Sequence, residues 1–242
     1  MQGGDFLELC QESYDLNGTS WAGLDISNEN LREINFGCAS FDSCTFRSVN
    51  FLDCYFDFVE LVDCTFINCS LRGASFDSAS ASGTLFQGCD INNAEFDGAQ
   101  LTGARFIGCY GAAVFSSALL DGAIFDVCDL TKSTFYRADL DNSQFTYCLL
   151  ENVNVNYETR AWAASFEDCD LTDTSLKYVA GFTSIDLKGI TISPYLLGSS
   201  FVKEMNGVTK KVEEKVNFST YTSRSKVAIL TCSNLELFRS VQ

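Results

Sequence analysis

The sequence of 242 residues contains no histidine, a single proline and only two methionines. Without an imidazole ring, a Ser-His-Asp or Cys-His catalytic group, a histidine metal ligand and a histidine pH switch are all excluded. The glycine-rich loops that hold nucleotide phosphates, G-x-x-x-x-G-K-[ST] and G-x-G-x-x-G, are also missing. Composition leaves paired carboxylates as the alternative catalytic groups, but we predict no catalytic residue, no cofactor and no metal, and a protein that is not an enzyme.

Long apolar segments are absent as well. No stretch approaches the ~20 apolar residues that are needed to span a bilayer. The first residues, from Met1 to Leu16, do not form a basic start followed by an apolar run, so they do not resemble an export signal. We expect no membrane contact and a cytoplasmic location, or a location in a virion if the protein is a structural component.

Cysteine is abundant, with 12 residues, but no C-x-x-C pair occurs. Zinc and iron–sulfur sites need close thiolate pairs, and disulfide frameworks belong to short exported chains. Six cysteines recur at intervals of 20, 20, 19, 20 and 21 residues: Cys69, Cys89, Cys109, Cys128, Cys148 and Cys169. A unit of about twenty residues therefore repeats. We predict free thiols that act as small apolar fillers, with a redox role as the weaker alternative.

A shorter period of five residues lies inside this repeat. Large apolar residues occupy every fifth position, which neither a helix nor a flat strand explains. The series includes Phe36, Phe41, Phe46, Phe51, Phe56, Leu61, Phe66, Leu71 and Phe76. It shifts by one residue after Gly111, and the irregular stretch from Asn156 to Ala163 adds one residue back. After a further insertion, Phe182, Leu187 and Ile192 continue the pattern.

The residues around each large centre are also patterned. Two residues before it the side chain is small, and Gly, Asn, Asp, Ser or Thr stand where the chain must turn. In this pattern, the sequence from Leu16 to Ile192 resembles the pentapeptide-repeat family. The resemblance implies an all-β fold, a right-handed quadrilateral β-helix in which four pentapeptides form one coil. About eight to nine coils would form a rod roughly 40 Å long at the ~4.8 Å spacing of strands in a sheet.

On this fold, two opposite faces carry stacked phenylalanines, with Leu, Ile and Ala on the faces between them. One stack contains Phe36, Phe56, Phe76, Phe96, Phe115 and Phe135, and the other contains Phe46, Phe66, Phe86, Phe106, Phe125, Phe145 and Phe166. The periodic cysteines form an inward ladder. We divide the chain into an N-terminal cap (1–15), the β-helix (16–192) and a non-repeat C-terminal segment (193–242). That segment either caps the last coil or serves as an arm for oligomerisation or anchoring.

Acidic residues dominate the repeat region. The net charge of the whole chain is −16, but residues 1–192 hold 9 basic and 28 acidic residues, a net of −19, whereas residues 193–242 have a net of +3. Outward positions one coil apart form two columns: Asp57, Asp77 and Asp97 in the first, Asp121 and Asp141 in the second. Such columns either keep a β surface soluble or mimic DNA phosphates in the basic groove of a protein. Direct binding to nucleic acid is disfavoured.

The pentapeptide-repeat family includes acidic rods that protect or inhibit bacterial type II topoisomerases. The chain is similar to them in charge, length and Cys- and Phe-rich repeats, and the segment from Ser184 to Ile192 is similar to the coil that ends their helix. The resemblance implies a protein partner, a type II topoisomerase such as gyrase. Tyr157, Arg160 and Trp162, in the one irregular stretch, join the two acidic columns as candidate partner-binding residues. The alternative is a structural or scaffolding component of a larger assembly such as a virion, whose partners are the assembly subunits.

Overall fold

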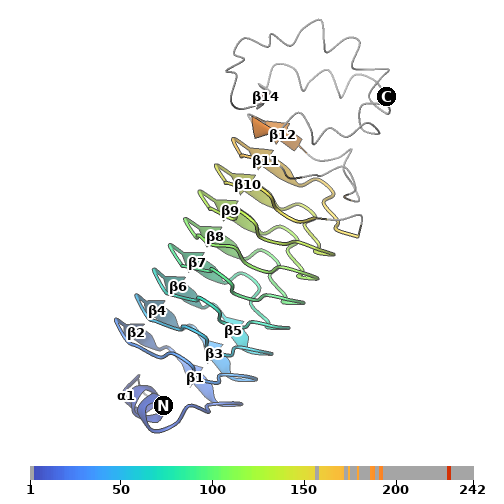
Figure 1. Ribbon diagram of the computed structural model, residues 1–242. Helices are drawn as coiled ribbons and strands as arrows, with labels where there is room; N and C mark the ends of the chain where they lie inside the picture. The colour runs from blue at the N-terminus through green and yellow to red at the C-terminus, as the bar shows by residue number, and fades with distance from the viewer. Residues whose placement is uncertain are drawn as a thin grey trace, which may run out of the picture.

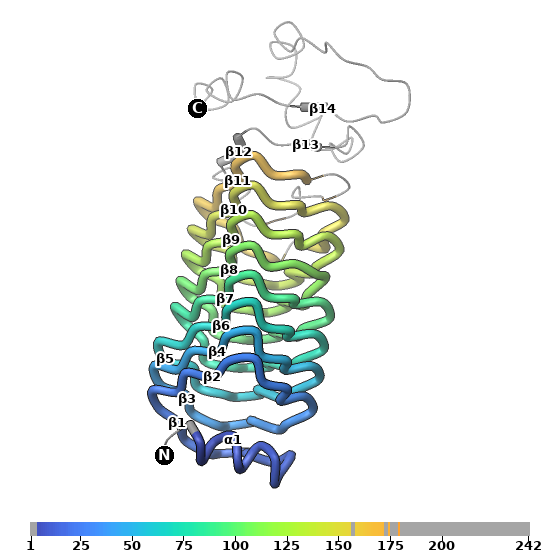
Figure 2. The backbone as a smooth tube through the Cα atoms, turned by 90° about the vertical axis from the view of Figure 1, so that its left-hand side faces the viewer, coloured from blue at the N-terminus to red at the C-terminus, as the bar shows by residue number. Residues whose placement is uncertain are grey.

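The protein is a rod of stacked coils, seen from two directions in Figures 1 and 2. The computed structural model describes residues 3–155, 158–171, 174, 179, 186–188, 191–192 and 228–229. Its elements are the helix α1 (Gly3–Glu12) and the strands β1 (Ser20–Ala22), β2 (Asp25–Ser27), β3 (Ser40–Asp42), β4 (Thr45–Arg47), β5 (Glu60–Val62), β6 (Thr65–Ile67), β7 (Leu85–Gln87), β8 (Arg105–Ile107), β9 (Ile124–Asp126), β10 (Gln144–Thr146), β11 (Ser165–Glu167), β12 (Asp186–Lys188), β13 (Thr191–Ile192) and β14 (Ala228–Ile229). The predicted fold class, a right-handed quadrilateral β-helix, is confirmed.

Each coil adds one short strand to a parallel sheet. Nine strands form the longest sheet, in the order β12-β11-β10-β9-β8-β7-β6-β4-β2, and β1, β3 and β5 form a second sheet. Strand partners are usually twenty residues apart, as in the pairing of Phe46 with Phe66. The pairing of Phe106 with Phe125 spans nineteen residues, and that of Phe145 with Phe166 spans twenty-one. The predicted deletion and insertion in the repeat are therefore confirmed.

The core is built from two stacks of phenylalanine rings that run along the rod. Neighbouring rings in one stack are close to parallel, with centroids 4.7–5.1 Å apart from Phe36 to Phe135. The second stack, from Phe46 to Phe166, has spacings of 4.7–5.2 Å. The two stacks meet edge to face, as Phe106 and Phe115 do at 5.5 Å. Both are geometries that aromatic rings prefer, so each coil is held to its neighbours by ring packing as well as by backbone hydrogen bonds.

Corners of the coil recur two residues after each large centre, and there the backbone adopts positive φ. Gly, Asn, Ser and Asp occupy most of these corners, because they tolerate the left-handed conformation. Three of the residues that break this preference are aromatic or β-branched apolar ones: Phe58 (φ 57°), Val127 (φ 55°) and Tyr147 (φ 52°). All three side chains are exposed, so none of them gains burial at its corner.

The cysteine ladder lies inside the rod, as predicted. Its six thiols are buried, and each donates a hydrogen bond to the carbonyl oxygen of a phenylalanine in the preceding coil, at 3.2–3.5 Å. Thr159 makes the equivalent bond to the carbonyl of Phe135 at 2.8 Å. All eleven described cysteines are free thiols. Cysteine at this position thus serves as a small residue that can also donate a weak hydrogen bond.

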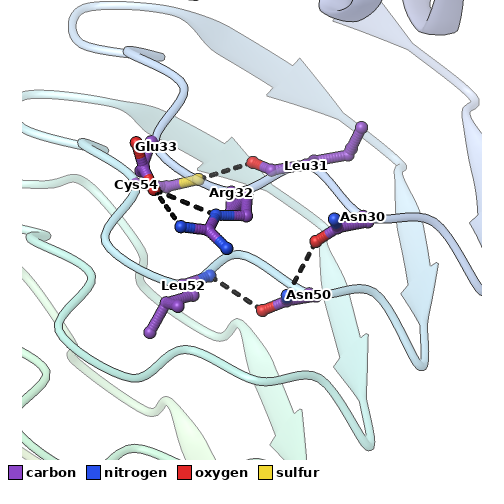
Figure 3. Close-up of polar contacts among 7 residues, drawn as sticks. All are labelled: Asn30, Leu31, Arg32, Glu33, Asn50, Leu52 and Cys54. Carbon is purple, nitrogen blue, oxygen red and sulfur yellow. Dashed lines mark hydrogen bonds and ion pairs between the residues drawn. The ribbon is translucent and has the colours of Figure 1, made fainter.

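Side chains also bond along the outside of the coils, as Figure 3 shows for two neighbouring turns near the N-terminal end. The amide of Asn50 donates to the side-chain oxygen of Asn30 at 2.7 Å and accepts from the backbone of Leu52 at 3.1 Å. Inside the same coils, the buried Cys54 thiol donates to the Leu31 carbonyl at 2.8 Å. The asparagine contacts satisfy polar groups at the turns and explain why Asn recurs there.

Helix α1 lies at the N-terminal end of the rod, beside the first coil (Figures 1 and 2). Its Phe6 is fully buried, with the ring centroid 4.9 Å from that of Trp21 and 6.1 Å from that of Phe36. The first phenylalanine stack is therefore extended by one ring into the helix. At the other end, β14 pairs antiparallel with β13, so residues 228–229 return to a strand that ends the repeat region. Phe182 lies outside the described residues.

Candidate protein-binding surface

The first predicted acidic column is a real feature of one face. Asp57, Asp77 and Asp97 stand one coil apart, since Phe58 N–H donates to the Asp77 carbonyl and Ser78 N–H to the Asp97 carbonyl. The hydroxyl of Ser75 donates to the carboxylate of Asp57. Within the described part of the chain, none of the three carboxylates forms an ion pair. The column is therefore a set of negative charges that no described basic residue neutralises.

Asp77 stands at the centre of this column and is half-buried, whereas Asp97 is exposed. One of its carboxylate oxygens is buried and has no hydrogen-bond partner among the described residues. Burial, followed by the charges of Asp57, Glu95 and Asp97, raises the pKa of Asp77 above its ordinary value. A positive group that approaches this face would therefore stabilise the ionised form of the Asp77 carboxylate.

The second acidic column is arranged differently. Arg160 forms ion pairs with Asp141 and, at 3.0 Å, with Asp139. The backbone N–H of Trp162 also donates to Asp141 at 2.8 Å, and only 13% of the Asp141 side chain is exposed. Asp121 accepts a hydrogen bond from the Asn142 amide at 2.7 Å. Internal partners thus hold Asp141 and Arg160, whereas the Trp162 side chain is 51% exposed. Tyr157 lies outside the described residues.

Two exposed aromatic residues that the sequence reasoning missed lie beside Asp57. Tyr55 and Phe58 are 54% and 63% exposed. With Asp57 they line an open surface groove whose other walls are Asn17, Asn35, Gly37 and Cys38. The signal was present in the sequence, because Phe58 stands at a corner position where the neighbouring coils have Cys38 and Ser78.

A separate apolar patch lies at another corner of the rod, formed by Val127, Tyr147 and Leu149. Val127 and Tyr147 occupy equivalent corners of neighbouring coils, since Val127 N–H donates to the carbonyl of Thr146. All three side chains are exposed. The sequence signal is again a bulky residue at a position that other coils fill with Gly, Asn or Ser.

Other kinds of site are not found in the described part of the chain. No group of three Cys, Asp or Glu side chains there could hold a metal ion. None of the helices in the same residues has the length and apolar character that a membrane span requires. Among the described residues, we consider the acidic column, the groove and the apolar patch as candidate binding features.

The coils, the inward large and small residues and the turn corners define a solenoid of five-residue repeats. The family model for pentapeptide repeats matches residues 60–96, 69–108 and 112–154, in eight copies. Residues 60–108 and 112–154 of this chain therefore consist of pentapeptide repeats. Comparison with curated protein sequences gives no match.

Solved structures of pentapeptide-repeat proteins are similar to this chain at low identity. A trypsin-treated variant of QnrB1, a plasmid-mediated fluoroquinolone resistance protein, is 17% identical with a TM-score of 0.35, covering 77% of this chain and 98% of its own. HetL, involved in heterocyst differentiation regulation in the cyanobacterium Nostoc sp. strain PCC 7120, is 16% identical with a TM-score of 0.32, covering 78% of this chain and 96% of its own. Similarity at this level does not transfer a function.

Proposed function

We propose that the protein is a non-catalytic binding rod whose acidic face occupies a basic, DNA-binding groove of a protein partner, with a bacterial type II topoisomerase such as gyrase as the favoured partner. One observation carries the proposal: the column of Asp57, Asp77 and Asp97 has no ion-pair partner among the described residues. The topoisomerase is favoured because of the resemblance to acidic rods of the same family.

The energetic argument concerns the cost of the column. Two unit charges about 5 Å apart repel by roughly 0.8 kcal/mol even in bulk water. This cost is offset when a basic groove supplies the opposite charge. Duplex DNA presents one phosphate per ~3.4 Å along each strand, so carboxylates repeated at ~4.8 Å offer a comparable line of negative charge. The same charge disfavours direct binding to nucleic acid.

The test is a gyrase supercoiling and DNA-cleavage assay at low salt. The wild-type rod should alter gyrase activity, and the triple variant Asp57→Asn, Asp77→Asn, Asp97→Asn should be weaker. The matched control, Asp126→Asn, Asp129→Asn, Asp168→Asn, removes the same charge around β9 and β11 and should retain most of the effect. Raising the salt concentration should reduce the wild-type effect, since exposed charges are screened within about 10 Å at 0.1 M. An equal loss of the effect on gyrase in both triple variants would contradict the proposal, because it would show that the overall negative charge acts and not this column.

The second candidate function is a structural component of an assembly, which the exposed patch of Val127, Tyr147 and Leu149 favours. Clustered apolar side chains on a surface are typical of protein contacts. In that case the aspartate substitutions should have little effect, whereas Val127→Gly with Tyr147→Gly, or deletion of residues 193–242, should prevent incorporation into the complex. The folding of the deletion variant must be checked first, because loss of a cap exposes strand edges. Gyrase indifference in a folded protein whose assembly is sensitive to these changes would favour the structural function.

A further inference from the structure

The groove beside the acidic column combines aromatic, amide and carboxylate groups. Tyr55, Asp57 and Phe58 form one part of its lining, and residues from the preceding coils form the rest. Gly37 lies between the side chains of Asn17 and Asn35, where an added Cβ would come within 2.8–2.9 Å of their polar atoms. The glycine therefore keeps this part of the groove open.

Phe58 stands at a corner whose backbone conformation is unfavourable for a bulky side chain. Its φ of 57° is in the left-handed region, which costs an L-residue with a Cβ roughly 1–2 kcal/mol relative to glycine. The equivalent corners of other coils carry residues such as Gly18, Ser78 and Gly98. Because the phenyl ring is 63% exposed, packing inside the rod does not offset this cost. Backbone strain combined with an exposed aromatic side chain is typical of a functional position.

We propose that this groove receives an arginine side chain of a protein partner. The inference rests on the proposed function, because it identifies which group of a basic partner is recognised at one point of the acidic face. Tyr55 and Phe58 provide ring faces for the guanidinium, and Asp57 provides its counter-charge. Asp77, one coil further on, adds a second negative charge to the same approach path.

Arginine fits these groups better than lysine does. A planar guanidinium stacks on aromatic rings and can still donate to a carboxylate in its own plane, whereas an ammonium is a compact and strongly hydrated charge. A nucleic acid would bring phosphates against Asp57 and Asp77 and would be repelled. The groove is therefore selective for one kind of side chain within a basic surface.

The first measurement is fluorescence anisotropy with labelled hexa-arginine and hexa-lysine peptides at 50 and 150 mM salt. The wild-type protein should bind hexa-arginine more tightly than hexa-lysine. The variant Tyr55→Ser, Phe58→Gly should bind hexa-arginine about tenfold more weakly. Its fold should be retained, because Ser75 and Gly98 occupy equivalent positions in other coils. The matched control, Val114→Ser, Ser117→Gly, changes the equivalent positions three coils further along the same face and should bind like the wild type.

The second measurement locates the bound peptide. Cys38 lines the groove and is exposed. Iodoacetamide alkylation followed by peptide mapping therefore measures whether a bound peptide covers the Cys38 thiol. Hexa-arginine should slow alkylation of Cys38 in the wild type and in the control variant, but not in the Tyr55→Ser, Phe58→Gly variant. Equal binding of hexa-arginine by all variants, or no protection of Cys38, would overturn the proposal that the groove binds arginine. These readouts contain no gyrase, so a failed supercoiling assay with intact protection of Cys38 would reject the topoisomerase and keep the arginine site.

Discussion

At the scale of single residues, the surroundings of Asp77 raise its pKa and make its contribution to stability depend on pH. Its carboxylate is partly buried and faces Asp57, Glu95 and Asp97, and these effects raise its pKa in the folded protein above the ordinary value of 3.8. A raised pKa means that folding favours the protonated form. The stability that Asp77 contributes is therefore fully present below pH 3.8 and is lost as the pH rises through the folded-state pKa.

The variant Asp77→Asn, which resembles the protonated form, should be more stable than the wild type at pH 7. The gain should shrink as the pH falls through the raised folded-state pKa of Asp77, because the wild-type carboxyl becomes protonated there. Urea unfolding at several pH values measures this. The control is Asp97→Asn in the same column, where the side chain is exposed and a smaller gain is expected. A loss of stability at pH 7 in Asp77→Asn would show that its charge is satisfied in the folded state.

At the scale of the element, the phenylalanine stacks contribute to the packing of each coil on its neighbours. Phe106 lies 4.8 Å from Phe86 and 4.9 Å from Phe125 in its own stack, measured between ring centroids. It is fully buried. Phe106→Ala should leave a cavity in the middle of the rod and lower the free energy of unfolding by about 3–5 kcal/mol. Phe106→Leu, which keeps most of the volume, should cost less than about 1.5 kcal/mol. Denaturant unfolding distinguishes the two variants, and midpoints unchanged from that of the wild type would show that ring packing is unimportant.

The short coil depends on Gly111. Its φ is 118°, and a Cβ at this position would lie 2.5 Å from the backbone nitrogen of Asn92. Gly111→Ala therefore requires the backbone itself to move, whereas Gly122→Ala meets no atom within 4 Å and only has to adopt a φ of 66°. We expect a cost of about 1 kcal/mol for Gly122→Ala and a clearly larger one for Gly111→Ala, measured by thermal unfolding. A similar cost for both would mean that the nineteen-residue coil can relax.

At the scale of the whole molecule, thiol reactivity measures how well the folded rod excludes solvent and reagents from its inward cysteines. Of the eleven described cysteines, Cys38 is exposed and ten are buried. Burial raises the pKa of the Cys54 thiol to about 12, so this thiol stays protonated and unreactive near neutral pH.

In the native protein, a neutral disulfide reagent should therefore modify Cys38 quickly and the ten buried thiols only at the rate of unfolding. In denaturant without reductant, close to all 12 cysteines should react. Peptide mapping assigns the fast thiols and separates Cys232, which lies outside the described residues. Pairs that stay protected in denaturant would indicate disulfides and reverse the assignment of the ladder as structural.

The sequence alone determined the fold, because the five-residue period leaves one large and one small side chain inward per repeat. Even the irregular coils followed from counting, since a residue lost near Gly111 or gained before Phe166 must shift every later centre. The inward cysteines followed for the same reason.

Only the tertiary structure decided what the outward residues do. Equal spacing placed Asp141 and Asp77 in similar columns, yet Arg160 neutralises Asp141 across a coil while Asp77 remains without an ion pair among the described residues. The groove beside Phe58 likewise depends on side chains from adjacent coils that are about twenty residues apart in the chain. The repeat determines which side chains are buried inside the rod. The contacts of outward side chains are not set by the repeat, because they depend on which residues of the adjacent coils lie within reach.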